Sequence, residues 1–481
     1  MFKHVLCGIL LIMLSGCMTV GPDYLRPDVD APATWRFKDA EARDLSNAAW
    51  WELFNDPVLN KLVAEAIQEN LDLRIATARV EEFFGRYFST RGDRFPRFDA
   101  GAIAGRQRVS EEGPTPIPAG TDPTFDYYEA FLSGSWELDF WGRYYRASEA
   151  ARAELAATAE GRRAVILTLV SAVASSYVEI RAFDKQLGIT LREAETRKQT
   201  LDVFQMRFQK GIIPEVDLSQ AKSQYQEVLS RIPEIELTIA QQENSLSILL
   251  GHFPGDIPRG LSIGELVPPP VPADIPSTVL EKRPDIQIAE QQLVAASARI
   301  GVAKSLYYPS ISLTGALGTV STDLSDLFTN SSKAWSLNVP VTTPIFTFGR
   351  IGGEVKAATS FQQQSLYNYL LTVQTAFREV DDALVGQAKT RQQLAALALQ
   401  VDALKDYVRL AWMRYDEGYT SYLEVLDAQR SLYDVELSYA RTQGNLLQSL
   451  VNVYKAMGGG WIAKAEQLGA PVPVEKAGLI P

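Results

Sequence analysis

Few residues of this chain are of the types that carry out catalysis or hold a metal. The 481 residues include two histidines, His4 and His252, and two cysteines, Cys7 and Cys17. Metal clusters, Cys/His dyads, Ser-His-Asp triads and disulfide frameworks all need more of these residues, or need them at closer spacing. The sequence therefore disfavours an enzyme. We expect no catalytic residue, no cofactor-binding residue and no metal site.

The overall composition argues against three further classes. There are 47 Lys and Arg against 58 Asp and Glu, which gives a net charge of -11. Because phosphate binding needs an excess of cations, this balance argues against a nucleic-acid partner. With 46% hydrophobic and 22% charged residues, the chain is neither disordered nor a bundle of transmembrane helices.

Cys17 is the residue whose surroundings predict a chemical modification. An apolar stretch at residues 5–14 is too short to span a bilayer but has the length of a signal-peptide core. The following Leu14-Ser15-Gly16-Cys17 resembles the lipobox of bacterial lipoproteins. We expect residues 1–16 to be removed as a signal peptide. Cys17 would then carry N-palmitoyl and S-diacylglycerol groups that anchor the mature chain to a membrane. An ordinary signal peptide with a chance cysteine is the alternative.

The chain contains two copies of one unit. The segment DLRIA at 72–76 aligns with DIQIA at 285–289, and Lys-Gly at 210–211 aligns with Glu-Gly at 417–418. The alignment shifts only within a loop-like stretch, where a duplicated unit tolerates a change of length. We expect these segments: a lipidated N-terminal segment at 17–55, a first repeat at 56–253, a proline-rich linker at 254–276, a second repeat at 277–460 and a C-terminal tail at 461–481.

Each repeat is predicted to contain a helix, two strands and then very long helices. Residues 143–209 contain no proline and would form a helix about 100 Å long at ~1.5 Å per residue. Residues 350–415 are their counterpart. The helices that follow show apolar residues at alternating spacings of three and four, the seam of a coiled coil. Gly211 and Gly418 fall where two long helices meet, which predicts the tips of two helical hairpins.

Four segments alternate apolar and polar residues as transmembrane strands do. They lie around residues 98–108, 127–140, 310–317 and 335–342. A soluble sandwich also alternates, but strands of this length with aromatic ends on a lipid-anchored chain favour an apolar face toward lipid and a polar face toward a lumen. Four strands cannot close a barrel, and open edges in hydrocarbon are costly. Several chains must therefore share one barrel, although this reasoning does not choose between two and three.

Five short motifs together resemble those of the outer-membrane factor family. They are the lipobox, VGPDY at 20–24, FGR at 348–350, LDAQRSL at 426–432 and MGGGW at 457–461. More narrowly, the chain resembles the lipoprotein exit ducts of resistance-nodulation-division multidrug efflux pumps. The resemblance implies a mixed α and transmembrane β fold: a homotrimer with a shared 12-stranded β-barrel, four strands per chain, continued by a long periplasmic α-helical barrel. Its location would be the cell outer membrane, lipid-anchored and extending into the periplasm.

The resemblance also implies a function and partners. The chain would be the outer-membrane channel component of a tripartite efflux system that passively conducts drugs or other small molecules from the periplasmic pump to the exterior. The partners would be a periplasmic adaptor (membrane fusion) protein, an inner-membrane resistance-nodulation-division transporter and outer-membrane lipid. Two other functions stay open, a type I protein-secretion duct and a non-pore periplasmic lipoprotein scaffold.

Two sets of site residues match positions of the family. A gate at the periplasmic tip maps to Leu423, Asp427 and Arg430, which share one helix face. Three Asp427 carboxylates around one aperture would repel each other and attract cations. Adaptor contact maps to Arg207, Gly211, Val216, Asp217, Arg414, Gly418, Ser421 and Leu426. A plainer interpretation treats the gate residues as ordinary helix residues, the glycines as turns and the arginines as helix caps.

Overall fold

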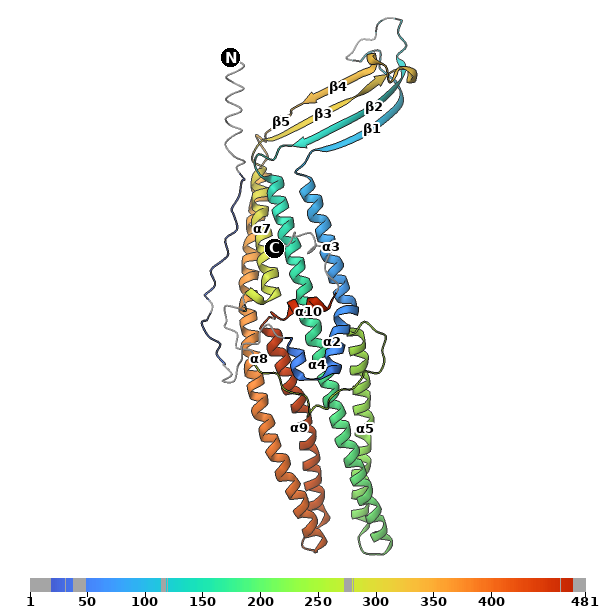
Figure 1. Cartoon of the computed structure of the whole chain (residues 1–481), viewed down its shortest axis with the longest axis vertical. Helices are drawn as coiled ribbons and strands as arrows, with labels where there is room; N and C mark the ends of the chain where they lie inside the picture. Colours follow the sequence, from blue (N-terminus) through green and yellow to red (C-terminus); the bar gives the residue numbers. More distant parts are fainter. Residues whose placement is uncertain are drawn as a thin grey trace. The chain divides into compact units, whose positions relative to one another are not determined.

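The computed structural model describes residues 19–30, 32–37, 49–113, 118, 120–271, 279, 281–458 and 460–469. The predicted signal peptide and Cys17 therefore lie outside the described residues. Elements of the first half are η1 (Trp50–Phe54), α2 (Pro57–Glu69), α3 (Leu71–Gly92), β1 (Arg97–Arg108), β2 (Thr124–Glu137), α4 (Arg143–Gln209) and α5 (Glu215–Leu249) (Figure 1). Elements of the second half are α7 (Pro284–Ser305), β3 (Ser310–Ser321), η2 (Leu324–Asp326), η3 (Asn330–Ser332), β4 (Lys333–Asn338), β5 (Val341–Thr342), α8 (Arg350–Asp416), α9 (Tyr422–Ala456) and α10 (Ile462–Leu468).

The two halves repeat the same helix lengths. The helices α4 and α8 each have 67 residues, and α5 and α9 each have 35. The proline-free stretches predicted as very long helices are thus confirmed. One window of α4 is apolar enough to cross a bilayer, but 50% of that window is buried in the protein. Ile166, Val173 and Tyr177 of α4 belong to a hydrophobic core.

The chain forms two compact units that cut across the two halves. One unit comprises Met1–Pro27, Glu82–Ala157 and Glu290–Asn368, and it contains the sheet. The other comprises Asp28–Glu81, Thr158–Ala289 and Tyr369–Pro481, and it contains the ends of both helical hairpins. Each unit therefore combines segments from the first and the second half of the sequence.

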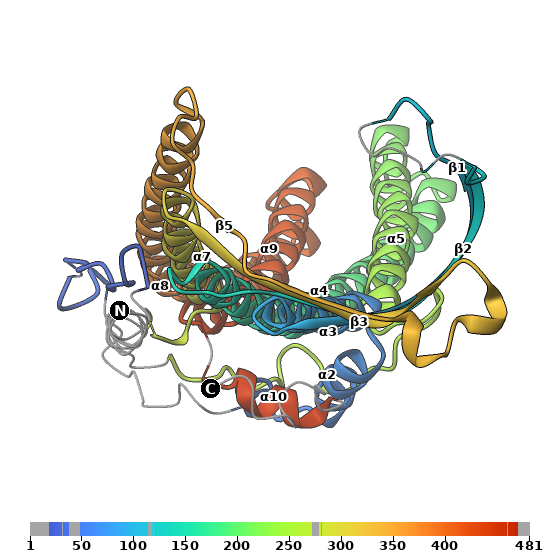
Figure 2. The ribbon, with the colours of Figure 1, turned by 90° about the horizontal axis from the view of Figure 1, so that it is seen from above.

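The sheet is antiparallel, in the order β1-β2-β3-β4, and it is curved (Figure 2). The four predicted strands are present, but the last is interrupted. Beyond Asn338 the short β5 also pairs with β3, and Pro340 lies between β4 and β5. Proline has no backbone N–H to donate to a strand partner, which accounts for the break. Within the described residues, β1 and β4 are each paired along one edge only.

The core of the hairpin-containing unit combines aromatic residues from the first and the last part of the sequence. Trp50, Trp51 and Phe54 are fully buried beside Tyr454 and Trp461. The rings of Trp50 and Tyr454 are stacked with centroids 5.5 Å apart. The short helix α10 follows Trp461 and lies against α2 (Figure 2). Residues predicted as a leading segment and a tail thus build part of the core.

The segment after α5 is also docked on this core. Ile257, Ile263 and Leu266 are at most 6% exposed. The buried carboxylate of Asp56 accepts hydrogen bonds from the Tyr177 hydroxyl (2.7 Å) and the Leu261 backbone N–H (3.0 Å). Its other oxygen accepts from Val58 N–H (2.9 Å) and so caps the N-terminus of α2. One side chain therefore joins α2, α4 and the proline-rich segment.

In the sheet-containing unit, the N-terminal segment is held where β2 ends and α4 begins. Val20 N–H donates to the carbonyl oxygen of Trp141 (3.1 Å), and the Asp23 carboxylate pairs with Arg146 (2.6 Å). A Cβ atom on Gly21 would lie 2.5 Å from the Cα of Gly301 in α7. Only residues without side chains allow the two backbones to approach this closely.

Candidate functional site

One face of the sheet carries exposed apolar side chains in rows that cross the strands. Leu132, Leu317 and Trp335 stand opposite one another on β2, β3 and β4 and are 52%, 64% and 78% exposed. Phe98 and Leu337 are the exposed ends of a second such row. A contiguous exposed apolar surface of this kind marks a contact with a membrane or with another protein. This face is suited to contact the hydrocarbon of a membrane.

The opposite face is polar. Arg97, Ser135, Thr314 and Asn338 form one row across the four strands. In the next row, the Asp99 carboxylate accepts a hydrogen bond from the Arg97 side chain (2.9 Å). The sheet thus has one apolar and one polar face, as the alternation in the sequence predicted.

Phe131 is the apolar residue that interrupts the polar face in the sequence pattern. Its ring extends over β1 and fills the space above Gly101, where an added Cβ would lie 2.7 Å from the ring. On its other side stands Gly318 of β3. The ring therefore lies over β1 and adds an apolar surface to the otherwise polar face.

The tips of the two hairpins have the same backbone. Gly211 and Gly418 adopt φ of 71° and 79°. Ile212 N–H donates to the Arg207 carbonyl (2.9 Å), and Tyr419 N–H donates to the Arg414 carbonyl (2.8 Å). This pattern is a Schellman motif, which closes a helix with a residue in the left-handed region, usually glycine. The predicted turns at both glycines are observed.

The side chains of the two tips differ. Arg414 pairs with Glu424 across the second tip, with 2.7 Å between Nη1 and Oε1. Arg207, at the matching place in the first tip, instead lies 5.9 Å from the ring centroid of Tyr415 in α8. Of the predicted contact residues, Val216 is 58% exposed but Leu426 only 7%. Leu426 is thus buried near the second tip, in the same apolar cluster as Phe204 and Tyr422.

An aromatic cluster joins the hairpins just beyond the tips. Phe204 of α4, Trp412 and Tyr415 of α8, and Tyr422 of α9 meet with centroid distances between 4.3 and 6.3 Å. Burial raises the pKa of Tyr422 to about 12, because desolvation disfavours its phenolate. No pattern in the sequence had led us to predict this cluster. Aromatic residues flanking both predicted turns were the available signal.

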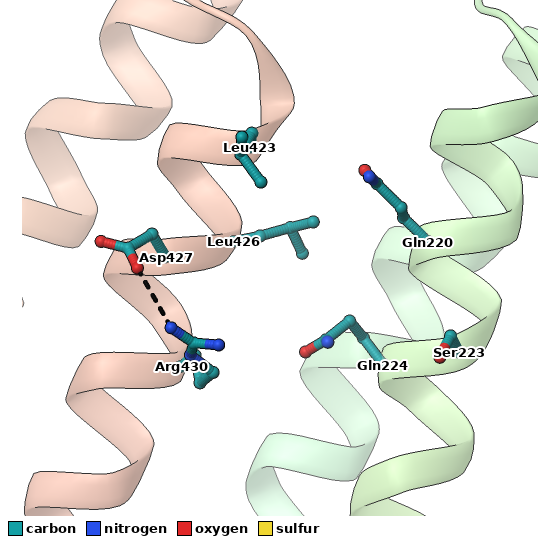
Figure 3. Close-up of a pocket in the computed structure, with 7 residues that line it drawn as sticks. All are labelled: Gln220, Ser223, Gln224, Leu423, Leu426, Asp427 and Arg430. Atoms are coloured by element: carbon teal, nitrogen blue, oxygen red, sulfur yellow. Dashed lines mark hydrogen bonds and ion pairs between the residues drawn. The ribbon is translucent and has the colours of Figure 1, made fainter.

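The three predicted gate residues lie together on the exposed surface of α9. Leu423 is 62% exposed, and the side chains of Asp427 and Arg430 are 53% and 62% exposed. Arg430 Nη2 lies 3.4 Å from Asp427 Oδ1. With Leu426 they line a groove of about 200 Å³ between α9 and α5, whose opposite wall is Gln220, Ser223 and Gln224. Figure 3 shows the leucines facing α5 and the Asp427 carboxylate turned away from it.

No group of three or more His, Cys, Asp or Glu side chains that could hold a metal occurs in the part of the chain that the structure describes. The described residues form a sheet with one apolar and one polar face, and a groove between α9 and α5 that includes charged Asp427 and Arg430.

A sheet with one face suited to lipid and one to water, joined to two long helical hairpins, defines the class of outer-membrane channels. The chain belongs to the outer membrane efflux protein family, whose model matches residues 62–252 and 275–459. It is 35% identical over 475 residues to the probable outer membrane lipoprotein SilC of Salmonella typhimurium, covering 96% of this chain and 100% of that one. It is also 35% identical to the solvent efflux pump outer membrane protein SrpC of Pseudomonas putida, covering 94% and 97% of the two chains.

A solved structure shows the same fold. The open state of the Neisseria gonorrhoeae MtrE outer membrane channel is 30% identical to this chain, covers 92% of it and 98% of its own length, and gives a TM-score of 0.82. These similarities confirm the predicted family, efflux function and outer-membrane location. The chain is an outer-membrane efflux channel, and its relatives are transport proteins.

Proposed function

We propose that this chain works as a homotrimer in which three sheets form one 12-stranded barrel in the outer membrane. The observation that carries the proposal is the sheet with an exposed apolar face and two unpaired edges, on β1 and β4. Unpaired backbone groups cost several kcal/mol each in hydrocarbon, so β1 of one copy must pair with β4 of the next. Two copies would give eight strands with a filled interior, whereas three leave a lumen.

The polar faces of the three sheets line that lumen. The hairpins α4–α5 and α8–α9 of the three copies continue it as an α-helical barrel through the periplasm. In this arrangement the segments 56–253 and 277–460 are two copies of one structural unit. The equal lengths of their long helices support the duplication.

The gate in this proposal is formed by Leu423, Asp427 and Arg430 around the threefold axis. All three side chains are exposed in the single chain and therefore free to meet their copies. Three Asp427 carboxylates facing one aperture would attract cations, and Arg430 balances part of this charge. The matching position on α5 is Gln220, which is uncharged, so the two hairpins would contribute unequally.

The hairpin tips are the proposed contact with a periplasmic adaptor protein, which links the duct to an inner-membrane resistance-nodulation-division transporter. Exposed Val216 and the turns at Gly211 and Gly418 support this role. Ser421 and Pro214 precede the two following helices with almost identical backbone angles. Only the serine carries a hydrogen-bonding side chain, so the tips need not bind alike.

The proposed cargo is drugs or other small molecules that the pump delivers. The relative named as part of a solvent efflux pump supports this class of cargo. Cys17, acylated with N-palmitoyl and S-diacylglycerol groups, would attach each copy to the membrane. The relative named as a lipoprotein supports the anchor.

The experiment is single-channel recording of the purified protein in planar bilayers. We expect conductance from a detergent-resistant trimer and a higher conductance for Asp427→Ala. Gln220→Ala is the matched control, because it truncates the corresponding side chain of the other hairpin without changing charge. An intact Asp427→Ala trimer with wild-type conductance would contradict the gate. A monomer without conductance would contradict the channel and favour a periplasmic scaffold.

A further inference from the structure

Among the residues that the structure describes, one charged side chain on the polar face of the sheet has no partner. Among the described residues of β1 to β4, this face carries Arg97, Asp99, Glu129 and Glu137. Arg97 pairs with Asp99, and Glu137 accepts hydrogen bonds from Tyr144 (2.9 Å) and Arg143 (3.4 Å). Glu129 makes no hydrogen bond or ion pair with any described residue. Its neighbours across the sheet are Ile103 on β1 and Val320 on β3.

Two aromatic rings stand on either side of Glu129 along the same strand and on the same face. Tyr127 and Phe131 each lie two residues, or about 7 Å, from Glu129. Both rings extend over β1, where glycines leave room for them. A Cβ on Gly105 would lie 2.5 Å from the Tyr127 ring, and one on Gly101 would lie 2.7 Å from the Phe131 ring. The two rings therefore lie over β1 on either side of Ile103, which is the neighbour of Glu129 across the sheet.

This combination selects one chemical class of ligand. A carboxylate supplies the charge for a cation, and aromatic rings within about 6 Å add cation–π attraction that is strongest for weakly hydrated cations. Small divalent cations instead prefer several oxygen ligands, which this surface does not provide. Aliphatic Ile103 and Val320 add surface for alkyl groups.

We infer that Glu129, Tyr127 and Phe131 form a binding site for organic monocations on the polar face of the sheet. The inference rests on the proposed channel, in which this face lines the lumen. It places a surface that contacts cargo on β2 of the proposed barrel, whereas the proposed gate lies on α9. In a trimer the site occurs three times, once on each copy.

The test is calorimetric titration of detergent-solubilised trimer with tetraethylammonium. All variants carry Asp427→Ala, so the Asp427 carboxylate cannot contribute to the measured binding of tetraethylammonium. We expect Glu129→Gln to raise the dissociation constant at least tenfold, Phe131→Leu and Tyr127→Leu to raise it about threefold each, and Glu129→Asp to retain binding. Asp126→Asn is the matched control, because it removes the same charge from the same strand on the opposite face.

The outcomes separate the site from the channel. Equal affinity of the Glu129→Gln and parent trimers overturns the site, whether or not the trimer conducts. Loss of binding in Asp126→Asn also overturns it, because a general effect of charge would then explain the result. Unchanged affinity in both ring variants overturns the aromatic contribution. Absence of conductance in every variant, with binding retained, contradicts the channel and leaves the site.

Discussion

The ring of Phe204 in α4 lies 4.3 Å from the ring of Tyr422 in α9, measured between centroids. Both side chains are at most 3% exposed. Phe204 belongs to the first hairpin and Tyr422 to the second, next to Leu423. The contact therefore fixes the start of the proposed gate helix against the neighbouring hairpin.

Replacing Phe204 with leucine should loosen this contact. The smaller side chain loses aromatic packing, and we expect the arrangement that contains this contact to lose about 1–2 kcal/mol of stability. Since about 1.4 kcal/mol corresponds to a tenfold change in an equilibrium, the ratio of open to closed events in single-channel records should change roughly tenfold. Phe361→Leu is the control, since that ring is 46% exposed on α8. Unaltered gating of an intact Phe204→Leu trimer would show that the cluster does not restrain the gate.

Tyr422 should make stability depend on pH in the alkaline range. Its folded pKa of about 12 lies above the ordinary value of 10, because burial favours the neutral phenol. The contribution of the neutral Tyr422 phenol to the free energy of unfolding is complete below about pH 10. It is lost as the pH rises toward 12, since in that interval Tyr422 ionises mainly in the unfolded chain. Thermal unfolding midpoints of the wild type should therefore fall more steeply there than those of Tyr422→Phe. Tyr419→Phe, at a 77% exposed side chain, should follow the wild type; parallel curves for all three would refute the assignment.

Asp56→Ala should destabilise the hairpin-containing unit. The change removes the cap of α2 and leaves the Tyr177 hydroxyl and the Leu261 N–H without their acceptor. We expect a loss of about 2–4 kcal/mol and a lower midpoint of thermal unfolding. Asp202→Ala, at an exposed position of α4, should change stability by less than about 0.5 kcal/mol. Equal midpoints for the two variants would mean that the carboxylate does not hold the linker.

Cys17→Ser should abolish acylation while leaving the barrel able to fold. Incorporation of labelled palmitate in cells measures the first effect, and detergent-resistant trimers measure the second. Cys7→Ser is the control, because residue 7 lies in the segment expected to be removed. Palmitate on the Cys17→Ser protein would disprove the lipobox assignment.

The sequence predicted those parts of the fold that depend on periodicity and on helix breakers. Proline-free stretches gave the long helices, and Gly211 and Gly418 marked the turns because a left-handed residue is needed there. Alternation gave the strands, although the break at Pro340 was not foreseen. These signals are local, and each can be read from one segment at a time.

The features that were missed depend on contacts between distant segments. Asp56 lies near Tyr177 and Leu261 only after folding. No spacing in the sequence predicts that its carboxylate accepts hydrogen bonds from both. Leu426, a predicted adaptor contact, is only 7% exposed and belongs to the same apolar cluster as Phe204 and Tyr422, which come from other parts of the chain or the helix start. Phe131 fits the polar face only because Gly101 stands opposite it on another strand. Residue type alone does not contain such pairings.

The close approach of Gly21 to Gly301 holds the N-terminal segment against α7. Thr19 lies beside Gly142, where an added Cβ would be 2.8 Å from its side chain. Cys17 precedes Thr19 by two residues and can extend at most about 7 Å beyond it. The fatty chains proposed on Cys17 would therefore enter the membrane next to the junction between β2 and α4. The length of this short N-terminal segment would then determine how deep the proposed barrel lies in the bilayer.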